Sequence, residues 1–248
     1  MSNIVIITGG SRGIGAATAI LAAERGFDVC LSYHSEAAAA DSVAQSVSDF
    51  GQRCLVVKSD VAEEADVVSL FEACRQELGT PSGLVNNAGI VALQSRVEDM
   101  TAERLQRVFA VNITGSFLCA REAVKCMSRE RGGAGGSIVN LSSAAARIGS
   151  PNEFVDYAAS KGAIDAFTLG LAKEVATAGI RVNAVRPGLI DTDIHASSGE
   201  PDRIERLRSA IPMQREGTAS EVAHSILWLL SDDASYTTGS FIEVSGGR

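Results

Sequence analysis

The apolar positions of this chain fall into short runs that alternate with longer amphipathic stretches. Residues 4–7 (IVII) form a compact apolar run, which predicts a fully buried strand. Residues 14–25 carry apolar side chains at helical spacing and end before Gly26, which predicts a helix followed by a glycine cap. The alternation continues and predicts strands at 29–33, 54–57, 84–86, 137–141, 181–185 and 241–244, with helices at about 35–50, 63–78, 101–128, 154–176 and 219–231.

Short buried strands separated by helices are typical of parallel βαβ units. The sequence therefore predicts an α/β fold, a single-domain Rossmann-type doubly wound parallel sheet of about seven strands flanked by helices. We expect one dinucleotide-binding domain over residues 1–248, because the chain shows neither a linker nor an internal repeat.

Composition narrows the class of protein. The net charge of −8 argues against a nucleic-acid partner and an acidic membrane surface. The five cysteines are scattered without a CxxC pair and the three histidines lie far apart, so we expect reduced thiols and no metal site. The sequence shows no signal peptide and no apolar run of membrane-spanning length, and we therefore expect a soluble, cytoplasmic protein.

Residues 8–15 (TGGSRGIG) place four glycines at the junction of the first predicted strand and helix. Ligands of doubly wound folds bind at the carboxyl ends of the strands, where the topology switches. Glycines at this junction let the backbone approach a pyrophosphate, which the helix N-terminus stabilises. The pattern predicts dinucleotide binding, although its G-x3-G-x-G spacing differs from the general dinucleotide fingerprint.

A further pair of residues suggests acid–base chemistry. Tyr157 and Lys161 lie four positions apart on a predicted helix, so their side chains share one face. A nearby ammonium favours the phenolate, and we expect Lys161 to lower the pKa of Tyr157 toward the working pH of a general acid or base. An isolated YxxxK pair is more often an ordinary surface pair, but here a Ser-Ser pair ends the preceding strand.

Together these motifs resemble the short-chain dehydrogenase/reductase family over nearly the whole chain. The motifs that carry the resemblance are TGGSRGIG at 8–15, Asp60-Val61, Asn86-Asn87-Ala88-Gly89, Asn112, Ser142-Ser143, Tyr157-Ala-Ala-Ser-Lys161, Pro187-Gly188 and the segment 236–241. The resemblance implies an oxidoreductase that transfers a hydride between a nicotinamide dinucleotide and a carbonyl or secondary alcohol. Glucose dehydrogenases and 3-oxoacyl thioester reductases are relatives with similar motifs.

The resemblance also assigns catalytic roles. It implies that Tyr157 moves the proton, that Lys161 lowers the tyrosine pKa and holds the nicotinamide ribose, and that Asn112 holds a water in the proton relay. Ser143 would hydrogen-bond the substrate oxygen, with Ser142 as the alternative. The interval from Ser143 to Tyr157 is fourteen residues, one more than in many relatives, which predicts a loop insertion around 150–153.

Cofactor contacts follow from the same motifs. Asp60 and Val61 would contact the adenine, the Asn87–Gly89 turn would lie along the ribose, and the segment from Pro187 would fix the nicotinamide ring. The full set of cofactor-binding candidates is Thr8, Gly9, Ser11, Arg12, Gly13, Ile14, Gly15, Tyr33, His34, Ser35, Asp60, Val61, Asn87, Ala88, Gly89, Tyr157, Lys161, Pro187, Gly188, Ile190 and Thr192.

The end of the second predicted strand bears on the choice of cofactor. An acidic residue there would accept a hydrogen bond from the ribose 2′-hydroxyl of NAD and repel a 2′-phosphate. Tyr33, His34 and Ser35 occupy this position instead, and Arg12 in the glycine loop supplies a positive charge. The sequence favours NADP over NAD, with Arg12 as a solvated loop residue in the alternative interpretation.

Residues 189–217 form a long polar stretch that resembles the family's substrate-binding lid. His195, Arg203, Arg206 and Arg208 could meet an anionic substrate group, although a solvated helix face is the favoured interpretation. The substrate itself is not decoded by this stretch. We expect a small-molecule carbonyl or alcohol.

Two further expectations concern activity and assembly. A catalytically silent NAD(P)-binding regulatory protein is the alternative function, but it predicts a damaged tetrad and all four residues are present. An enoyl reductase is disfavoured, because those relatives show a wider Tyr–Lys spacing. Helices 101–128 and 154–176 form dimer seams in the family, which implies a homotetramer built as a dimer of dimers.

Overall fold

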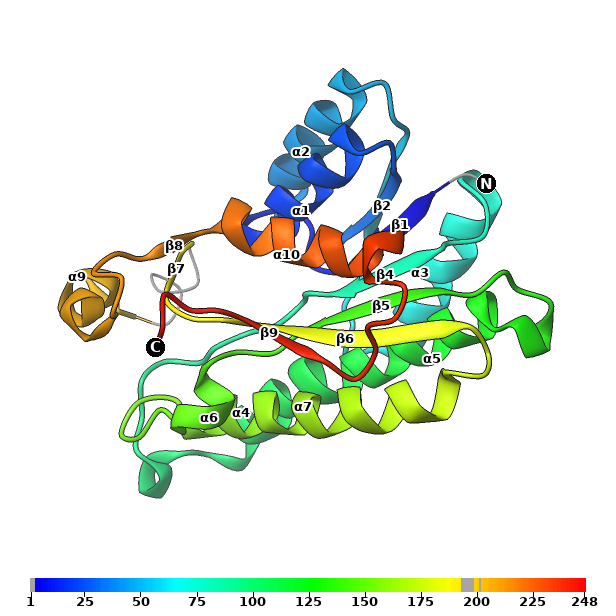
Figure 1. The fold of residues 1–248 in the computed structure, drawn as a ribbon. Helices are drawn as coiled ribbons and strands as arrows, with labels where there is room; N and C mark the ends of the chain where they lie inside the picture. The colour runs from blue at the N-terminus through cyan, green and yellow to red at the C-terminus, as the bar shows by residue number, and fades with distance from the viewer. Residues whose placement is uncertain (1–2, 193–198, 201) are drawn as a thin grey trace.

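The fold was obtained as a computed structural model that describes residues 3–192, 199–200 and 202–248 (Figure 1). A seven-stranded parallel sheet runs in the order β3-β2-β1-β4-β5-β6-β9. Its strands are β1 (Ile4–Ile7), β2 (Asp28–Tyr33), β3 (Cys54–Lys58), β4 (Gly83–Asn86), β5 (Gly136–Leu141), β6 (Ile180–Pro187) and β9 (Phe241–Val244). The predicted doubly wound α/β fold and its seven strands are confirmed.

Helices cover both faces of the sheet (Figure 1). One apolar layer packs β1, β2 and β5 against α1 (Gly13–Glu24), α2 (Ala37–Asp49) and α10 (Ala219–Leu230). The other layer packs the opposite face against α3 (Glu64–Glu77), α5 (Gly115–Met127) and α7 (Val155–Val175). Residues 4–7 of the central strand β1 are fully buried and alternate between the two layers, which explains their unbroken apolar run.

The strand order reverses between β1 and β4. The chain passes from β1 outward through β2 and β3, then returns to place β4 on the other side of β1. The loops that follow these two neighbouring strands diverge to opposite faces of the sheet and leave a crevice at its carboxyl edge. The glycine loop 8–15 and the Asn87–Gly89 turn are those two loops.

The prediction of one continuous helix over 101–128 is wrong, because a π-helical turn interrupts it. The chain forms α4 (Ala102–Phe109), then a π-helical turn over Ala110–Thr114, then α5. Asn112 lies in this turn with its side chain fully buried. A π-turn inside a helix is frequently found at a functional site.

Beyond the carboxyl edge of the sheet, the segment after β6 forms small elements. Strands β7 (Ile190–Asp191) and β8 (Gly217–Thr218) pair in parallel. Helix α9 (Arg203–Leu207) lies beyond them, at the same end of the molecule as the carboxyl ends of the sheet strands (Figure 1). The candidate His195 lies outside the described residues. A short helix, α6 (Ala145–Ile148), also follows β5 and was not predicted.

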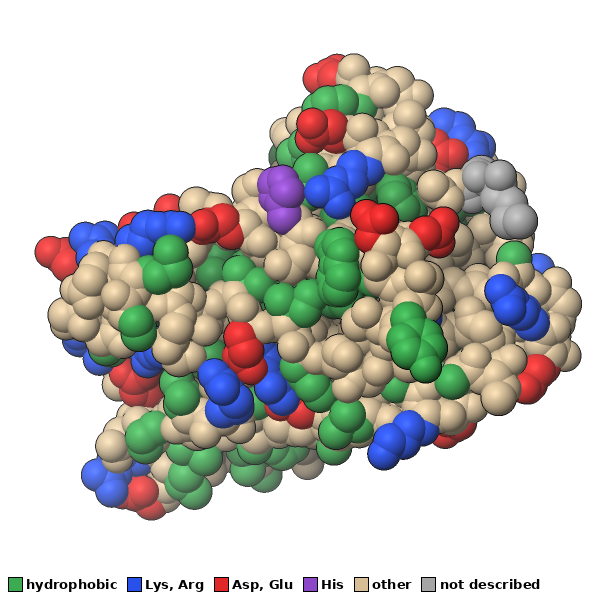
Figure 2. Space-filling model, viewed as in Figure 1, with side chains coloured by type: hydrophobic (Ala, Val, Ile, Leu, Met, Phe, Trp, Pro, Cys, Tyr) green, Lys and Arg blue, Asp and Glu red, His purple; other side chains and the backbone are tan. Residues whose placement is uncertain are grey.

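Charged side chains of both signs are interspersed on the face shown in Figure 2. Around α9 they form ion pairs, among them Arg208 with Glu216 and Arg215 with Glu221, at 3.0 and 2.6 Å. This face carries no single-sign basic surface of the kind that phosphate backbones require. None of the helices in the described part of the chain has the length and apolar character needed to cross a membrane.

Candidate active site

The glycine loop turns from β1 into α1 with glycine at the positions where a side chain would be strained or would clash with the backbone. Gly13 has a φ of 55°, in the left-handed region that favours glycine. At Gly15 a Cβ would collide with the carbonyl oxygen of Gly9 and would lie 2.6 Å from Nδ2 of Asn87. Helix α1 then begins without a side-chain cap and without an acidic residue in its first turn. Its N–H groups are therefore available to an anion.

The turn after β4 holds the glycine loop in place. Nδ2 of Asn87 donates to the carbonyl oxygens of Thr8 and Gly9, both at 2.9 Å. The hydroxyl of Thr8 accepts from the backbone N–H groups of Asn87 and Ala88, at 3.1 and 3.0 Å. These reciprocal bonds fix the two loops on either side of the crevice. Thr8 and Asn87 thus determine the width of the site.

Asn112 connects the same turn to helix α7. Its Oδ1 accepts from the N–H of Ile90 at 2.8 Å, and its Nδ2 donates to the carbonyl of Ile90 at 2.9 Å and to Oγ of Ser160 at 3.1 Å. Ser160 in turn donates to the carbonyl of Tyr157 at 2.7 Å. The side chain of Asn112 therefore positions the segment after Gly89 against the helix that carries Tyr157.

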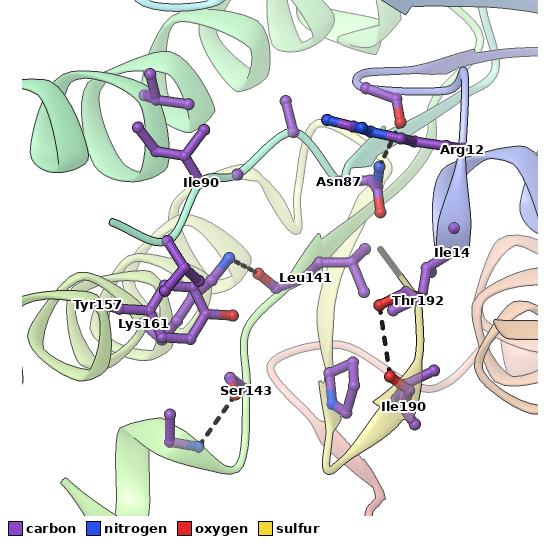
Figure 3. Close-up of a pocket in the computed structure, with 18 of the residues that line it drawn as sticks. Arg12, Ile14, Asn87, Ile90, Leu141, Ser143, Tyr157, Lys161, Ile190 and Thr192 are labelled. Carbon is purple, nitrogen blue, oxygen red and sulfur yellow. Dashed lines mark hydrogen bonds between the residues drawn. The ribbon is translucent and has the colours of Figure 1, made fainter. Parts of the chain in front are cut away.

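Three of the predicted catalytic side chains converge. Tyr157 and Lys161 lie on one face of α7, with Nζ of Lys161 5.6 Å from the centre of the Tyr157 ring. Nζ donates to the carbonyl of Leu141, at the end of β5, at 2.6 Å. Figure 3 shows Ser143 just beyond Leu141 and on the same side of the cavity as Tyr157.

The two serines after β5 face different partners. The hydroxyl of Ser142 donates to Oδ1 of Asp165 at 2.6 Å and is engaged away from Tyr157. Oγ of Ser143 accepts from the N–H of Ala145 at 3.1 Å, which leaves its own proton free to be donated. The Ser143 hydroxyl also acts on the Tyr157 hydroxyl, where hydrogen bonding lowers the tyrosine pKa.

The predicted effect of Lys161 on Tyr157 is not what the structure shows. Burial raises the pKa of Tyr157 above its ordinary value, and the Ser143 hydroxyl and the positive charge of Arg203 oppose this shift without cancelling it. Burial also lowers the pKa of Lys161 to about 8, against the attraction of Asp165. The ammonium donates to the Leu141 carbonyl, and both Tyr157 and Lys161 are protonated at neutral pH.

One cavity of about 410 Å³ joins these groups to the glycine loop. Its walls include Ser143, Tyr157, Lys161 and all of the predicted cofactor contacts except Thr8 and Gly15. Thr8 lies behind the wall, where it bonds the Asn87 turn, and Asn112 is likewise buried behind it. In Figure 3, Arg12 and Ile14 lie across the cavity from Tyr157 and Lys161.

At the end of the cavity near β2, Glu36 is the first carboxylate after the strand, and no acidic residue stands at the two positions that directly follow it. Tyr33, His34 and Ser35 line it, and the exposed Arg12 has neither an ion pair nor a side-chain hydrogen bond within the described residues. Asp60 accepts from Arg107 at 2.9 Å and lies 3.5 Å from His34. Burial alone would raise the pKa of Asp60, but the Ala62 N–H and Arg107 hold it below its usual range.

The opposite wall comes from the end of β6 and from β7. Pro187, Gly188, Ile190 and Thr192 all line the cavity. A Cβ at Gly188 would lie 2.7 Å from the Cα of Ser245, so only glycine fits beside this neighbouring loop. The methyl of Thr192 faces Gly13 across the cavity mouth, and the distance to a Cβ built there would be 3.3 Å. The lid segment thus begins in contact with the glycine loop.

Comparison with known proteins gives this arrangement its family. A family model described as Enoyl-(Acyl carrier protein) reductase matches residues 9–248. The chain is 55% identical over 245 residues to an uncharacterized oxidoreductase, YgfF, of Escherichia coli, with 99% of both chains covered. This chain belongs to the short-chain dehydrogenase/reductase family. It is therefore an oxidoreductase of that family, as its sequence motifs predict.

Two further comparisons, one with a curated relative and one with a solved structure, also cover nearly the whole chain. This short-chain dehydrogenase/reductase is 35% identical over 242 residues to glucose 1-dehydrogenase 2 of Bacillus subtilis, covering 98% of this chain and 93% of that one. A solved structure of a blue fluorescent protein from a metagenomic library, in complex with NADPH, superposes with a TM-score of 0.90 at 31% identity. That match covers 99% of this chain and 97% of the other.

Several wall residues of this short-chain dehydrogenase/reductase were not identified from the sequence. Arg107, Phe154 and Arg248 line the cavity although they stand outside the recognised motifs. Arg203 was considered, but the favoured solvated interpretation is wrong for it, since the residue is only 8% exposed and lines the cavity. Arg206 and Arg208 are half-exposed and form ion pairs on the lid surface. From the sequence, only the positive charge of Arg203 within the 189–217 stretch pointed to a place in the site.

Metal chemistry has no visible ligand set. Within residues 3–192, 199–200 and 202–248, no three His, Cys, Asp or Glu side chains come together as metal ligands. The cysteines in the described ranges carry free thiols, and burial raises the pKa of Cys54 to about 11 and that of Cys119 to about 12.

Proposed function

We propose that this protein transfers a hydride between NADP(H) and a carbonyl or secondary-alcohol substrate, with Tyr157 as the acid–base residue. The observation that supports this proposal is the single cavity that unites Tyr157, Lys161 and Ser143 with the glycine loop. A binding site for the dinucleotide and a proton donor are then within one enclosed space, as carbonyl reduction requires.

The residues present fit the cofactor. The α1 N-terminus has no side-chain cap, and Gly13 and Gly9 line the cavity beside it, so a pyrophosphate can approach the backbone N–H groups. Asn87 and Lys161 would hold the ribose that carries the nicotinamide, and Pro187 and Thr192 would bound the ring. When bound, the nicotinamide supplies the hydride for reduction or accepts it in oxidation.

The protein groups then handle the substrate oxygen. The Tyr157 hydroxyl, protonated at neutral pH, donates its proton to the oxygen as negative charge develops there. The Ser143 hydroxyl would turn its proton from Tyr157 to the same oxygen and supply a second hydrogen bond, which stabilises that charge. Lys161 would hold the cofactor ribose, and Asn112 bonds Ser160 on the helix that carries both Tyr157 and Lys161. We assign the catalytic serine to Ser143 because Ser142 is engaged with Asp165.

The preference for NADP over NAD rests on charge. No carboxylate directly follows β2, and Arg12 is exposed and unpaired within the described residues at that end of the cavity. A guanidinium there pairs readily with a 2′-phosphate. The NADPH bound to the structurally similar metagenomic protein is consistent with this preference.

The decisive experiment is a fluorescence titration with NADPH and NADH, followed by a carbonyl panel monitored at the NAD(P)H absorbance band. Sugars, diketones, thioesters, steroids and aromatic aldehydes would form the panel. We expect tight NADPH binding and turnover that falls by about 10²–10⁴ in Tyr157→Phe, while NADPH binding stays unchanged. Binding without any Tyr157-dependent turnover would favour the catalytically silent regulatory protein instead.

A second variant tests the cofactor preference alone. Arg12→Ala should weaken NADPH binding by about tenfold, the effect of losing one charged hydrogen bond, and leave NADH binding unchanged. Equal affinities for the two nucleotides in the unmodified protein, unaffected by Arg12→Ala, would contradict the preference for NADP.

We also propose a homotetramer built on the α5 and α7 faces. Phe117 of α5 stacks on Phe167 of α7, with ring centres 3.7 Å apart, yet it remains 46% exposed. Leu169 on α7 is also exposed. Large apolar side chains that stay exposed on two adjacent helices are consistent with a surface buried by a second copy.

A further inference from the structure

Arg203 is a buried cation whose hydrogen-bonding capacity is not filled. Its Nη2 pairs with Oε2 of Glu153 at 2.8 Å, and its guanidinium lies over the ring of Phe154, 4.7 Å from the ring centre. Its Nη1 is buried and has no hydrogen-bond partner among the described residues. Ser59 Oγ and Asn86 Oδ1 are also buried without a partner, but neither carries a charge. A charged donor left unpaired in a buried position is costly, and a native protein usually employs it.

The side chain that carries this unfilled donor lines the cavity of the candidate active site. Arg203, Phe154 and Tyr157 all line it, and the positive charge of Arg203 acts to lower the Tyr157 pKa, although burial outweighs this effect. Arg203 comes from α9 in the lid, and Glu153 and Phe154 come from the turn just before α7. The cation is therefore held beside the position that the reacting oxygen would take.

The turn that holds Arg203 lies where the sequence predicts an insertion, around 150–153. Ser150 and Asn152 adopt left-handed φ angles of 44° and 63°, which non-glycine residues rarely do. This compact turn presents Glu153, which accepts from both Arg203 and Arg206. Without a carboxylate at this place, a buried guanidinium would be strongly disfavoured. The turn and the lid arginine thus form one unit.

The charge balance around Arg203 leaves room for a single additional negative charge. Glu153 is shared between Arg203 and Arg206, and Arg206 also pairs with Glu200 at 3.0 Å. Arg248 lines the same cavity, and its charge adds to the effect of burial in lowering the pKa of Arg203. A monoanion suits one free nitrogen beside these groups. A phosphate dianion would need more donors and would lie near the Glu153 carboxylate.

We propose that the substrate is an aldehyde or ketone that carries a carboxylate, and that Nη1 of Arg203 binds this carboxylate while the carbonyl faces Tyr157. This inference rests on the proposed reductase function and deepens it by naming the substrate class. Arg203 is a specificity residue in this scheme, and Arg248 adds to the positive potential at the same end of the cavity.

The test compares carboxylic acids with neutral analogues of the same shape. Straight-chain ω-oxo acids of increasing length and the isomeric carboxybenzaldehydes would be assayed with NADPH beside the primary amide of each. We expect the best acid to exceed its amide by at least about tenfold in kcat/KM. Arg203→Met should lower kcat/KM for that acid by about 10- to 100-fold, mainly through KM, and change the amide by less than about threefold.

Three variants separate recognition from folding. Arg206→Met is the matched control, since it removes a half-exposed partner of the same Glu153 that does not line the cavity, and the acid-to-amide ratio should not change. Arg203→Lys keeps the charge and should retain a preference for the acid. The double variant Glu153→Gln/Arg203→Met leaves no stranded buried carboxylate, so loss of the preference there cannot be attributed to misfolding.

Binding gives a readout that does not depend on turnover. Benzoate and short aliphatic carboxylates would be titrated into the enzyme–NADPH complex, with inorganic phosphate as the comparison. Carboxylate binding that disappears in Arg203→Met would support the proposal.

Equal kcat/KM for acids and amides, with Tyr157-dependent turnover of both, would overturn it while the reductase function stands. Tighter binding of phosphate than of any carboxylate would also overturn it. NADPH binding with no turnover of any carbonyl would instead refute the reductase function.

Discussion

Removal of the buried charge at Lys161 should stabilise the protein. Lys161 is 5% exposed, and burial lowers its pKa from 10.5 to about 8. Each pKa unit corresponds to about 1.4 kcal/mol, so a difference of about 2.5 units means that the charged amine costs the folded state about 3 kcal/mol relative to the unfolded chain. The hydrogen bond to the Leu141 carbonyl returns about 1 kcal/mol. Lys161→Met should therefore raise the free energy of unfolding by about 1–3 kcal/mol at pH 7.

The pH dependence has a definite sign. The folded pKa lies below the unfolded one, so the unfolded state binds the proton first as the pH falls from 10.5 to 8, and the penalty is complete below pH 8. By the same linkage, the penalty at pH 9.5 is only about 1.4 kcal/mol. The stabilisation by Lys161→Met should thus shrink by about 2 kcal/mol between pH 7 and pH 9.5.

Urea unfolding without nucleotide, at one fixed protein concentration, measures this effect. Unfolding would be followed by circular dichroism at pH 7, 8 and 9.5. Lys173→Met is the matched control, because Lys173 lies on the same helix with its side chain exposed, and it should change stability by less than about 0.5 kcal/mol at every pH. An unfolding midpoint for Lys161→Met that is unchanged or lower at pH 7, or a difference independent of pH, would refute the reasoning. Loss of turnover in the stabilised variant would show a catalytic group retained at a cost in stability.

Three other predictions concern the proton, the interrupted helix and assembly. Because burial keeps Tyr157 protonated at neutral pH, the rate of alcohol oxidation should rise about tenfold per pH unit between pH 7 and pH 9. The rate of carbonyl reduction should stay nearly constant from pH 6 to pH 8. An oxidation rate that does not change with pH would exclude Tyr157 as the base. Asn112→Leu should destabilise the protein by about 2–3 kcal/mol and lower kcat, because the backbone N–H and carbonyl of Ile90 both lose their partner. Urea unfolding would measure the loss of stability, steady-state kinetics would measure kcat, and no change in either would contradict the prediction. Leu169→Glu should reduce the assembly to a smaller oligomer in sedimentation, with Arg25→Glu as the control, because exposed Arg25 follows α1 on the other side of the sheet. A monomer in the unmodified protein would contradict the tetramer.

The sheet could be predicted because its signals are local. Each buried strand is a short apolar run, and the glycine loop follows the first one directly. Neither feature depends on contacts with distant parts of the chain. Short-range periodicity also placed Tyr157 and Lys161 on one helical face, and the structure brings both into the cavity.

The interruption of the helix at 110–114 had no such local signal. Residues 101–128 read as one continuous helix, and the π-turn arises from tertiary contacts. Asn112 bonds both backbone groups of Ile90, and a Cβ at Gly115 would lie 2.7 Å from Cγ2 of Val61. These contacts join segments more than twenty positions apart, so helical periodicity carries no trace of them.

The pKa relation between Tyr157 and Lys161 was mispredicted for a related reason. Spacing along a helix shows that two side chains are neighbours, but it does not show how deeply they are buried or where the ammonium is directed. Burial raises the pKa of Tyr157 and lowers that of Lys161, and Nζ of Lys161 donates to the Leu141 carbonyl. The pKa values expected from the spacing of Tyr157 and Lys161 therefore differ from those that burial in the fold produces.

The same argument separates the chemistry of the site from its specificity. In the proposed mechanism, proton transfer depends on Tyr157 and Lys161, which a single helix brings together. The carboxylate-binding role proposed for Arg203 depends on two segments about fifty positions apart, the turn at Glu153 and the lid helix α9. Exchange of that turn for a shorter one without a carboxylate should therefore leave Arg203 without its ion pair and abolish the acid preference, while amides are still reduced. If the acid preference survived that exchange, the turn would not be what holds Arg203 in the cavity.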